Sequence, residues 1–263
     1  MGPDHPKPVR PRCVQRDLLW LRSVLNWATT WQTEDGRFLL AANPVRGFET
    51  PTEENPRRPV ASTDRLEAVL KAAETLEMEL RWGGKARRQR AYLADILTLA
   101  AKTGRRITAI LSLKWQDVLW DQGPHGSIRW QAAADKQGRE WVAPLSPESR
   151  SVLDRMKAER PGVGAALLFP SPTNPDSPVT YERARTWLLR AEELAEVSKQ
   201  EGGSFHPYRR AWATARKHLP LVDVAAAGGW RSTAVLLRHY QQPDDETLLR
   251  VVLGGGALRE RHA

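Results

Sequence analysis

The sequence of 263 residues has very little cysteine and no long apolar segment. Its single cysteine, Cys13, excludes an internal disulfide and a metal site made of several cysteines. A chain without disulfides is typical of a reducing compartment, so we expect a cytoplasmic protein. No apolar run approaches the roughly 18 residues of a membrane span, and the opening MGPDHPKPVRPR lacks the apolar core of a signal peptide. We therefore expect no membrane partner.

Motifs of several common enzyme classes are also missing. The chain has no Gly-x-Gly-x-x-Gly fingerprint for dinucleotides and no Gly-x-Ser-x-Gly elbow for a serine nucleophile. Gly84-Lys85-Ala86 lacks the upstream glycine and the serine or threonine of a phosphate-binding loop. No His-x-x-x-His pair with a nearby acid is present, which excludes a zinc hydrolase of that kind. Nothing in these patterns indicates a cofactor or a metal ion.

Positive charge, in contrast, is present in excess. Lysine and arginine number 40 against 31 aspartates and glutamates, so the formal net charge is +9. Between Arg81 and Arg106, eight basic residues accompany a single acid, Asp95. This balance is compatible with a nucleic-acid partner, and a solvated basic face is the alternative. Hydrophobic residues at 41% are ordinary for a globular protein that buries a core.

The first part of the chain reads as one helix between two proline-rich segments. Four prolines in residues 1–11 predict a disordered lead-in. Apolar residues then recur at spacings of three and four through residues 12–31, which predicts an amphipathic helix that needs partners for its apolar face. Prolines punctuate residues 43–60, which we interpret as an extended linker.

The remainder, residues 61–263, has the pattern of one domain. Helices are expected after the capping sequence Ser62-Thr63-Asp64, and again over residues 86–101 beyond the Gly83-Gly84 break. Residues 117–144 alternate short apolar runs with turns, which predicts a small three-stranded antiparallel sheet. Helical patterns dominate from Thr180 to Leu253. The expected fold is therefore mainly α with one small sheet.

Three segments carry residues suited to chemistry on a phosphate. In Thr103-Gly104-Arg105-Arg106-Ile107, the glycine ends one helix and Arg106 starts the next, where an arginine can help backbone N–H groups to hold a phosphate. His206 and Arg209 lie three residues apart and share one face of a helix, although a lone histidine is more often structural. Tyr240 has polar neighbours and ends a helical pattern, and a plain surface tyrosine is the alternative.

Taken in order, these residues resemble the tyrosine recombinase, or phage integrase, family over residues 60–253. Its first motif, Thr-Gly-x-Arg-Ile, is matched at Thr103 to Ile107, and its second, His-x-x-Arg-x-x-x-Ala-Thr, at His206 to Thr214. A lysine on a β-hairpin is matched by Lys136, which has no other lysine between Lys114 and Lys157. The resemblance therefore implies a catalytic set, which is Arg106, Lys136, His206, Arg209, Trp230 and Tyr240.

The resemblance implies the fold of that family's catalytic domain and a chemistry that needs neither metal nor cofactor. Tyr240 would attack a DNA phosphodiester to give a 3′-phosphotyrosyl enzyme, with His206 as the candidate proton acceptor. Arg106 and Arg209 would clamp the phosphate oxygens, Lys136 would protonate the leaving 5′-oxygen, and Trp230 would pack the site.

The partner implied by the family is double-stranded DNA, so the protein would associate with the nucleoid when bound. Candidate DNA contacts are the basic residues Lys85, Arg87, Arg88, Arg90, Arg105 and Arg210. Family members act as tetramers, and an apolar helix at about residues 245–253 is expected to pack into a neighbouring protomer. Residues 1–42 resemble the last helix of the family's DNA-clamping core-binding domain, preceded by the lead-in.

Two departures from the family pattern keep alternatives open. Ala109 stands where the family often has an acid, and the spacing from Trp230 to Tyr240 is one residue longer than usual, so a bulge is needed to re-aim the tyrosine. A catalytically impaired DNA-binding relic of a recombinase is one alternative. A type IB topoisomerase, which relaxes one duplex with similar chemistry, is the other.

Overall fold

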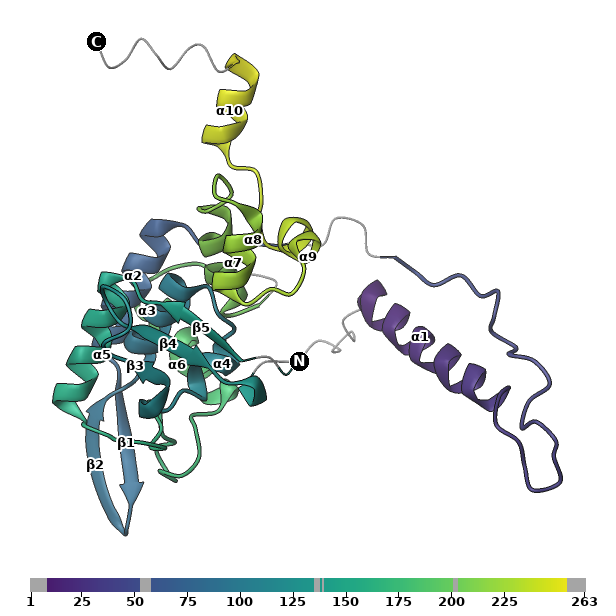
Figure 1. The fold of residues 1–263 in the computed structure, drawn as a ribbon, viewed down its shortest axis with the longest axis horizontal. Coiled ribbons are helices and arrows are strands. Elements are labelled where there is room, and N and C mark those ends of the chain that lie inside the picture. The colour runs from purple at the N-terminus through teal and green to yellow at the C-terminus, as the bar shows by residue number, and fades with distance from the viewer. Residues whose placement is uncertain (1–8, 53–57, 135–137, 139, 201–202, 255–263) are drawn as a thin grey trace, which may run out of the picture. The chain divides into compact units, whose positions relative to one another are not determined.

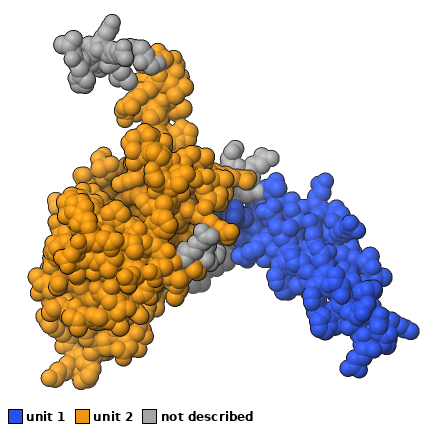
Figure 2. Space-filling view, in the orientation of Figure 1, with its two compact units in different colours: residues 1–57 blue, residues 58–263 orange. Residues whose placement is uncertain are grey.

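The computed structural model describes residues 9–52, 58–134, 138, 140–200 and 203–254. The chain divides into two compact units, residues 1–57 and residues 58–263 (Figure 2). None of the helices among the described residues is long and apolar enough to cross a membrane.

Unit 1 is built on one helix, α1 (Pro11–Ala28), and a segment that turns back along it. The Leu40 N–H donates to the Ala28 carbonyl at 3.1 Å, and the Asn43 amide donates to the Arg22 carbonyl at 3.1 Å. The sequence predicts that this helix continues to residue 31, but it ends earlier, at Ala28. The Thr29 and Thr30 hydroxyls donate to carbonyls of its last turn, which favours this end. Of the helix, only Ala28 is buried, so its apolar face stays largely uncovered within this unit.

Unit 2 is mainly α, as the sequence predicts (Figure 1). Its small sheet has the strand order β3-β4-β5, all antiparallel, and a separate two-stranded sheet pairs β1 with β2. In chain order its elements are α2 (Thr63–Glu74), β1 (Glu77–Trp82), β2 (Lys85–Arg90), α3 (Leu93–Thr103), α4 (Ile107–Leu111), the 3-10 turn Trp115–Asp117, β3 (Val118–Leu119), β4 (Ser127–Trp130), the 3-10 turn Ala132–Ala134, β5 (Trp141–Pro144), α5 (Pro147–Glu159), α6 (Tyr181–Leu194), α7 (His206–Thr214), α8 (Leu221–Gly228), α9 (Thr233–His239) and α10 (Asp245–Leu253).

The hairpin β1–β2 corrects one sequence expectation. Residues 86–90 were expected to begin a helix, but they pair as a strand with residues 77–82 around a turn at Gly83-Gly84. Both glycines have positive φ, 58° and 76°, the conformation that a tight hairpin turn requires. In β1, Met78 and Leu80 are buried and alternate with exposed glutamates, so the period of this segment is two rather than 3.6.

Helix α3 supplies the centre of the core. Leu93, Ile96 and Leu97 are fully buried, and α3 contacts α2, α5, α6 and α7. The helix ends at Gly104, as the sequence predicts, in the left-handed conformation at φ 64°. A Cβ at this position would lie 2.4 Å from the Trp212 ring, so only glycine fits both the turn and the packing.

A buried carboxylate at the start of α3 joins it to the neighbouring elements. Asp95 is fully buried and accepts from Arg155 at 2.6 Å, from Arg160 at 2.6 Å and from Arg90 at 3.0 Å. The three arginines come from α5, from its C-terminal cap and from β2. This cluster therefore fixes the hairpin and α5 to the core helix.

Replacement of Asp95 by Asn should destabilise the protein by about 3–5 kcal/mol, because it removes the fully buried carboxylate that three partly buried arginines share. Urea unfolding measures the change. The matched control is Asp154→Asn, which breaks only a half-exposed ion pair with Arg150 and should alter stability little. Equal stability of the two variants would contradict a structural role for the Asp95 cluster.

Helices α7, α8 and α9 share a second, smaller core. Its buried members are Trp212, Ala213, Val224, Ala225, Trp230 and Leu236, with Tyr240 packed against them. Four residues of the predicted catalytic set lie on or beside these helices, namely His206, Arg209, Trp230 and Tyr240. The small core therefore determines where their side chains meet.

Candidate active site

Arg209 occupies the middle of the site. It lies on the first turn of α7 and is 3% exposed, and its Nη1 donates to the carbonyl of Gly104. Its guanidinium stacks over the Trp230 ring at 3.8 Å and lies 5.2 Å from the centre of the Tyr240 ring. Its Nε and Nη2 atoms are buried without a hydrogen-bond partner among the described residues. Two donors of a buried cation are therefore left for a ligand.

The charge around Arg209 is positive. Burial, together with the charges of Arg106 and Arg105, lowers the pKa of Arg209 to about 9, and the opposing effect of Tyr240 is smaller than that of burial. An unpaired buried cation is costly, and a bound anion removes that cost. The site is therefore electrostatically suited to a phosphate.

Arg106 is the residue at the N-terminal cap of α4, as the sequence predicts. It has extended backbone angles, and its carbonyl accepts the first hydrogen bonds of the helix from Ala109 and Ile110. Its side chain lines a cleft of about 180 Å³ together with His206 and Arg209. The first and second motifs therefore converge on one cavity.

His206 stands at the start of α7, one turn before Arg209, and keeps part of its surface exposed. Partial burial lowers the pKa of His206, and the charges of Arg210, Arg209 and Arg106 lower it further. The imidazole is therefore neutral at pH 7 and able to accept a proton. Its ring centre lies 6.4 Å from that of Tyr240.

Trp230 is the member of the small core that Arg209 contacts. Its ring stacks on Trp212 at 5.9 Å and meets Tyr240 edge-on at 4.8 Å. Its Nε1–H is buried and has no hydrogen-bond partner among the described residues. The indole thus orients the tyrosine and offers one further donor to a ligand.

Tyr240 follows the last residue of α9 and is half-buried. Its N–H and that of Gln241 both donate to the Leu236 carbonyl at 3.0 Å. The helix therefore ends in a widened turn that Gln241 closes. The Tyr240 carbonyl accepts from the Thr214 hydroxyl at 3.2 Å, which ties the tyrosine to the last residue of α7.

Two other predicted residues are not among the side chains described so far. Lys136 lies outside the described residues, between Trp130 of β4 and Trp141 of β5, which are paired across the sheet. Arg90, a candidate DNA contact, is bound into the cluster around Asp95, so the structure assigns it to the core.

The remaining candidate DNA contacts have different environments. Lys85, Arg87 and Arg88 are exposed on β2, at the end of unit 2 away from α7 and α9 (Figure 1). Arg210 is half-buried, and its Nη1 donates to the Pro59 carbonyl at 3.1 Å. Arg105 is 7% exposed, donates to the Ala226 carbonyl at 3.2 Å and lines the same cleft as Arg106, His206 and Arg209.

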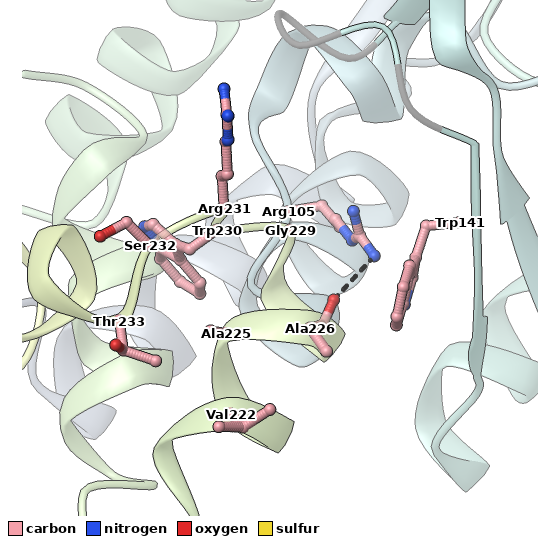
Figure 3. Close-up of a pocket in the computed structure, with 10 residues that line it drawn as sticks. All are labelled: Arg105, Trp141, Val222, Ala225, Ala226, Gly229, Trp230, Arg231, Ser232 and Thr233. Carbon is pink, nitrogen blue, oxygen red and sulfur yellow. Dashed lines mark hydrogen bonds between the residues drawn. The ribbon is translucent and has the colours of Figure 1, made fainter.

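The importance of Trp212 and Arg105 for the site was not foreseen. The Trp212 Nε1 donates to the Lys102 carbonyl at 2.9 Å, and its ring lies between Trp230 and the Arg216 guanidinium. The high tryptophan content, 11 residues, was the only sequence signal for such stacking. Arg105 lines a pocket of about 470 Å³ beside Trp230, where it faces Trp141 of β5 (Figure 3).

The fold and the site together define a protein class. The model of the phage integrase family matches residues 61–247, so the chain belongs to the phage integrase family. No curated protein matches the chain in sequence.

Solved structures with this fold are site-specific recombinases and integrases. The chain is similar to XerH site-specific recombinase bound to its palindromic difH substrate, with a TM-score of 0.71 and 19% identity over 94% of this chain. It is also similar to lambda integrase bound to a COC′ core site (TM-score 0.65, 17% identity, 90% of this chain). The Tn1549 transposon integrase in complex with circular intermediate DNA has a TM-score of 0.65 and 14% identity over 94% of this chain. The chain spans 65% of the XerH chain, 60% of the lambda integrase chain and 80% of the Tn1549 chain.

Proposed function

We propose that this protein is a site-specific DNA recombinase that cuts and rejoins DNA strands through a covalent bond between Tyr240 and a 3′-phosphate. The observation that carries the proposal is Arg209, a buried cation beside the Tyr240 ring, two of whose donors have no partner in the part of the chain that the structure describes. XerH and lambda integrase, whose fold this chain has, are bound to DNA in their structures, which supports duplex DNA as the ligand.

The nucleophile needs help because an ordinary tyrosine hydroxyl ionises near pH 10, so forming a phenolate at pH 7 costs about 4 kcal/mol. In the proposed step, the Tyr240 oxygen attacks phosphorus and its proton passes to neutral His206, directly or through a water molecule. The positive charge of Arg209 and Arg106 favours the developing phenolate.

The transition state carries additional charge on the non-bridging phosphate oxygens. Arg106 and Arg209 reach one cleft from two helices, so their planar groups are placed to donate to those oxygens. Trp230 adds its buried N–H. The 5′-oxygen leaves with a proton, for which we propose Lys136 as the donor.

Rejoining is the reverse reaction. A free 5′-hydroxyl attacks the phosphotyrosine, the phosphodiester forms again, and Tyr240 regains its proton. Because the covalent intermediate retains the energy of the cleaved bond, no ATP is required.

The test is incubation of the full chain with a nicked substrate, from which the short 5′-hydroxyl product diffuses away. We expect a protein–DNA adduct that resists denaturation, with the DNA attached to the peptide containing Tyr240. A chain that binds DNA but yields no adduct is the catalytically impaired relic. Relaxation of a single supercoiled duplex without a paired site identifies a topoisomerase instead.

The exposed cations of the hairpin, Lys85, Arg87 and Arg88, are proposed to contact DNA phosphates. Their joint replacement by alanine should weaken DNA binding and reduce the slope of log affinity against log salt by about 0.9 for each lost contact. Adduct formation at saturating DNA should be unchanged, because the hairpin lies away from α9, the helix that Tyr240 follows (Figure 1). The control is Arg190→Ala, an exposed arginine paired with Glu193 on α6. An unaltered salt slope in the triple variant would remove the hairpin from the DNA interface.

Helix α10 is proposed to join protomers in a tetramer. None of its residues is buried, and Leu249, Val251 and Val252 are 57%, 78% and 81% exposed. A short helix with such an apolar face gains stability by packing on a partner. The double variant Leu249→Asp and Val252→Asp should convert the DNA-bound tetramer to smaller species in analytical ultracentrifugation, whereas Arg250→Gln on the same helix should not. A tetramer that survives the two aspartates would exclude this role.

A further inference from the structure

Arg105 joins two parts of the site that are distant in the sequence. Its guanidinium lies 5.0 Å from the centre of the Trp130 ring, on the last residue of β4. Its Nη2 donates to the carbonyl of Ala226, in the last turn of α8 (Figure 3). The same side chain fills the space above Gly229, where an added Cβ would lie 2.3 Å from Nη1. One buried side chain therefore holds the sheet against the turn that follows α8.

That turn carries Trp230. The Trp230 N–H donates to the Ala225 carbonyl at 2.8 Å, one residue before the carbonyl that Arg105 binds. Trp230 in turn stacks on Arg209 and meets Tyr240 edge-on. A shift of the Gly229–Trp230 turn would therefore move the Trp230 ring, against which Arg209 and Tyr240 pack.

The contacts of Arg105 suit a guanidinium and no smaller cation. A helix C-terminus carries partial negative charge on its last carbonyls, and an aromatic face attracts a cation. The planar group of arginine reaches a carbonyl with one edge while it presents its face to a ring, which the compact ammonium of lysine does not reproduce. Arg105 also adds positive charge next to Arg209.

We propose that Arg105 is a positioning residue: it locks the Gly229–Trp230 turn onto β4 and thereby holds Arg209 and Tyr240 in register for cleavage. The inference rests on the proposed function for its effect on cleavage, but its structural content is independent of it. It replaces the assignment of Arg105 as a DNA contact.

Single-turnover cleavage of the nicked substrate at saturating DNA gives the first measurement. Arg105→Ala should cleave at least about tenfold more slowly, and Arg105→Lys should be intermediate, because it keeps the charge but loses the planar contacts. Both variants should bind DNA with the wild-type salt slope, because no phosphate contact is lost. The control is Arg183→Ala, which removes the same charge from an exposed position of α6. Wild-type cleavage rates in both Arg105 variants, or a reduced salt slope, would overturn the proposal.

Hydrogen–deuterium exchange of the protein without DNA gives the second measurement. In both Arg105 variants, residues 225–232 should exchange faster while α2 and α5 keep wild-type protection, which also shows that the variants fold. If the wild type forms no adduct, the proposed function fails, and this exchange decides the positioning role alone. Unchanged protection of residues 225–232 would overturn it.

Discussion

Tyr240→Phe should abolish the covalent DNA adduct and leave DNA binding nearly intact. The substitution removes only the hydroxyl oxygen that would attack phosphorus. The ring remains, so the edge-on contact with Trp230 at 4.8 Å and the hydrogen bond from Thr214 to the backbone carbonyl are preserved. The neighbouring Tyr208 does not replace it, because Tyr208 is 1% exposed and burial raises its pKa to about 12.

The measurement pairs adduct formation on a nicked substrate with affinity from a mobility-shift titration. Tyr208→Phe is the matched control, since that tyrosine is fully buried in the main core. It should form the adduct as the wild type does. An adduct in Tyr240→Phe would show that another residue is the nucleophile.

Arg209→Lys should lower the rate of cleavage by about 10²- to 10³-fold, the usual effect of removing one donor to transition-state charge. The guanidinium reaches the Gly104 carbonyl with one nitrogen and keeps Nε and Nη2 for a ligand, while its face covers Trp230. A lysine ammonium fills one of these positions and leaves the others empty. The loss therefore arises although the charge is retained.

Single-turnover cleavage at saturating DNA measures this loss, and the thermal unfolding midpoint of the variant shows whether the small core survives. Arg183→Lys, at an exposed position of α6, is the matched control and should cleave at the wild-type rate. A rate for Arg209→Lys within a few-fold of the wild type would show that Arg209 supplies only charge.

Local features of the fold could be predicted from the sequence better than the pairing of separate segments. Helix ends were predictable where one residue type decides them, as at Gly104 and at the capping sequence Ser62-Thr63-Asp64, where the Ser62 hydroxyl accepts from the Arg65 N–H at 3.2 Å. The hairpin β1–β2 was missed because its second strand is rich in arginine, which helices also accept, while its partner strand decides the pairing. Propensity is a weak signal where a neighbouring strand competes.

The candidate site shows the same division. The residue types and order of Arg106, His206, Arg209, Trp230 and Tyr240 were readable because short spacings fix which helix face each occupies. The environments of Arg90 and Arg105 were not readable. Both lie in a basic stretch of sequence. Arg90 meets the buried Asp95. Arg105 meets Trp130 and Ala226, which other segments of the chain contribute.

The sequence alone determined the family, the mainly helical fold with its small sheet and the residues of the candidate catalytic set, since these follow from local spacing and residue type. Only the tertiary structure decided that Tyr240 is half-buried against Trp230, that Arg209 keeps two donors unpaired and that Arg105 belongs to the site. The physical reason is that burial, stacking and unpaired donors depend on which segments pack together. In this protein, hydrogen bonds join the end of α3 and the Gly104-Arg105 segment to α7 and α8, across more than one hundred residues of chain.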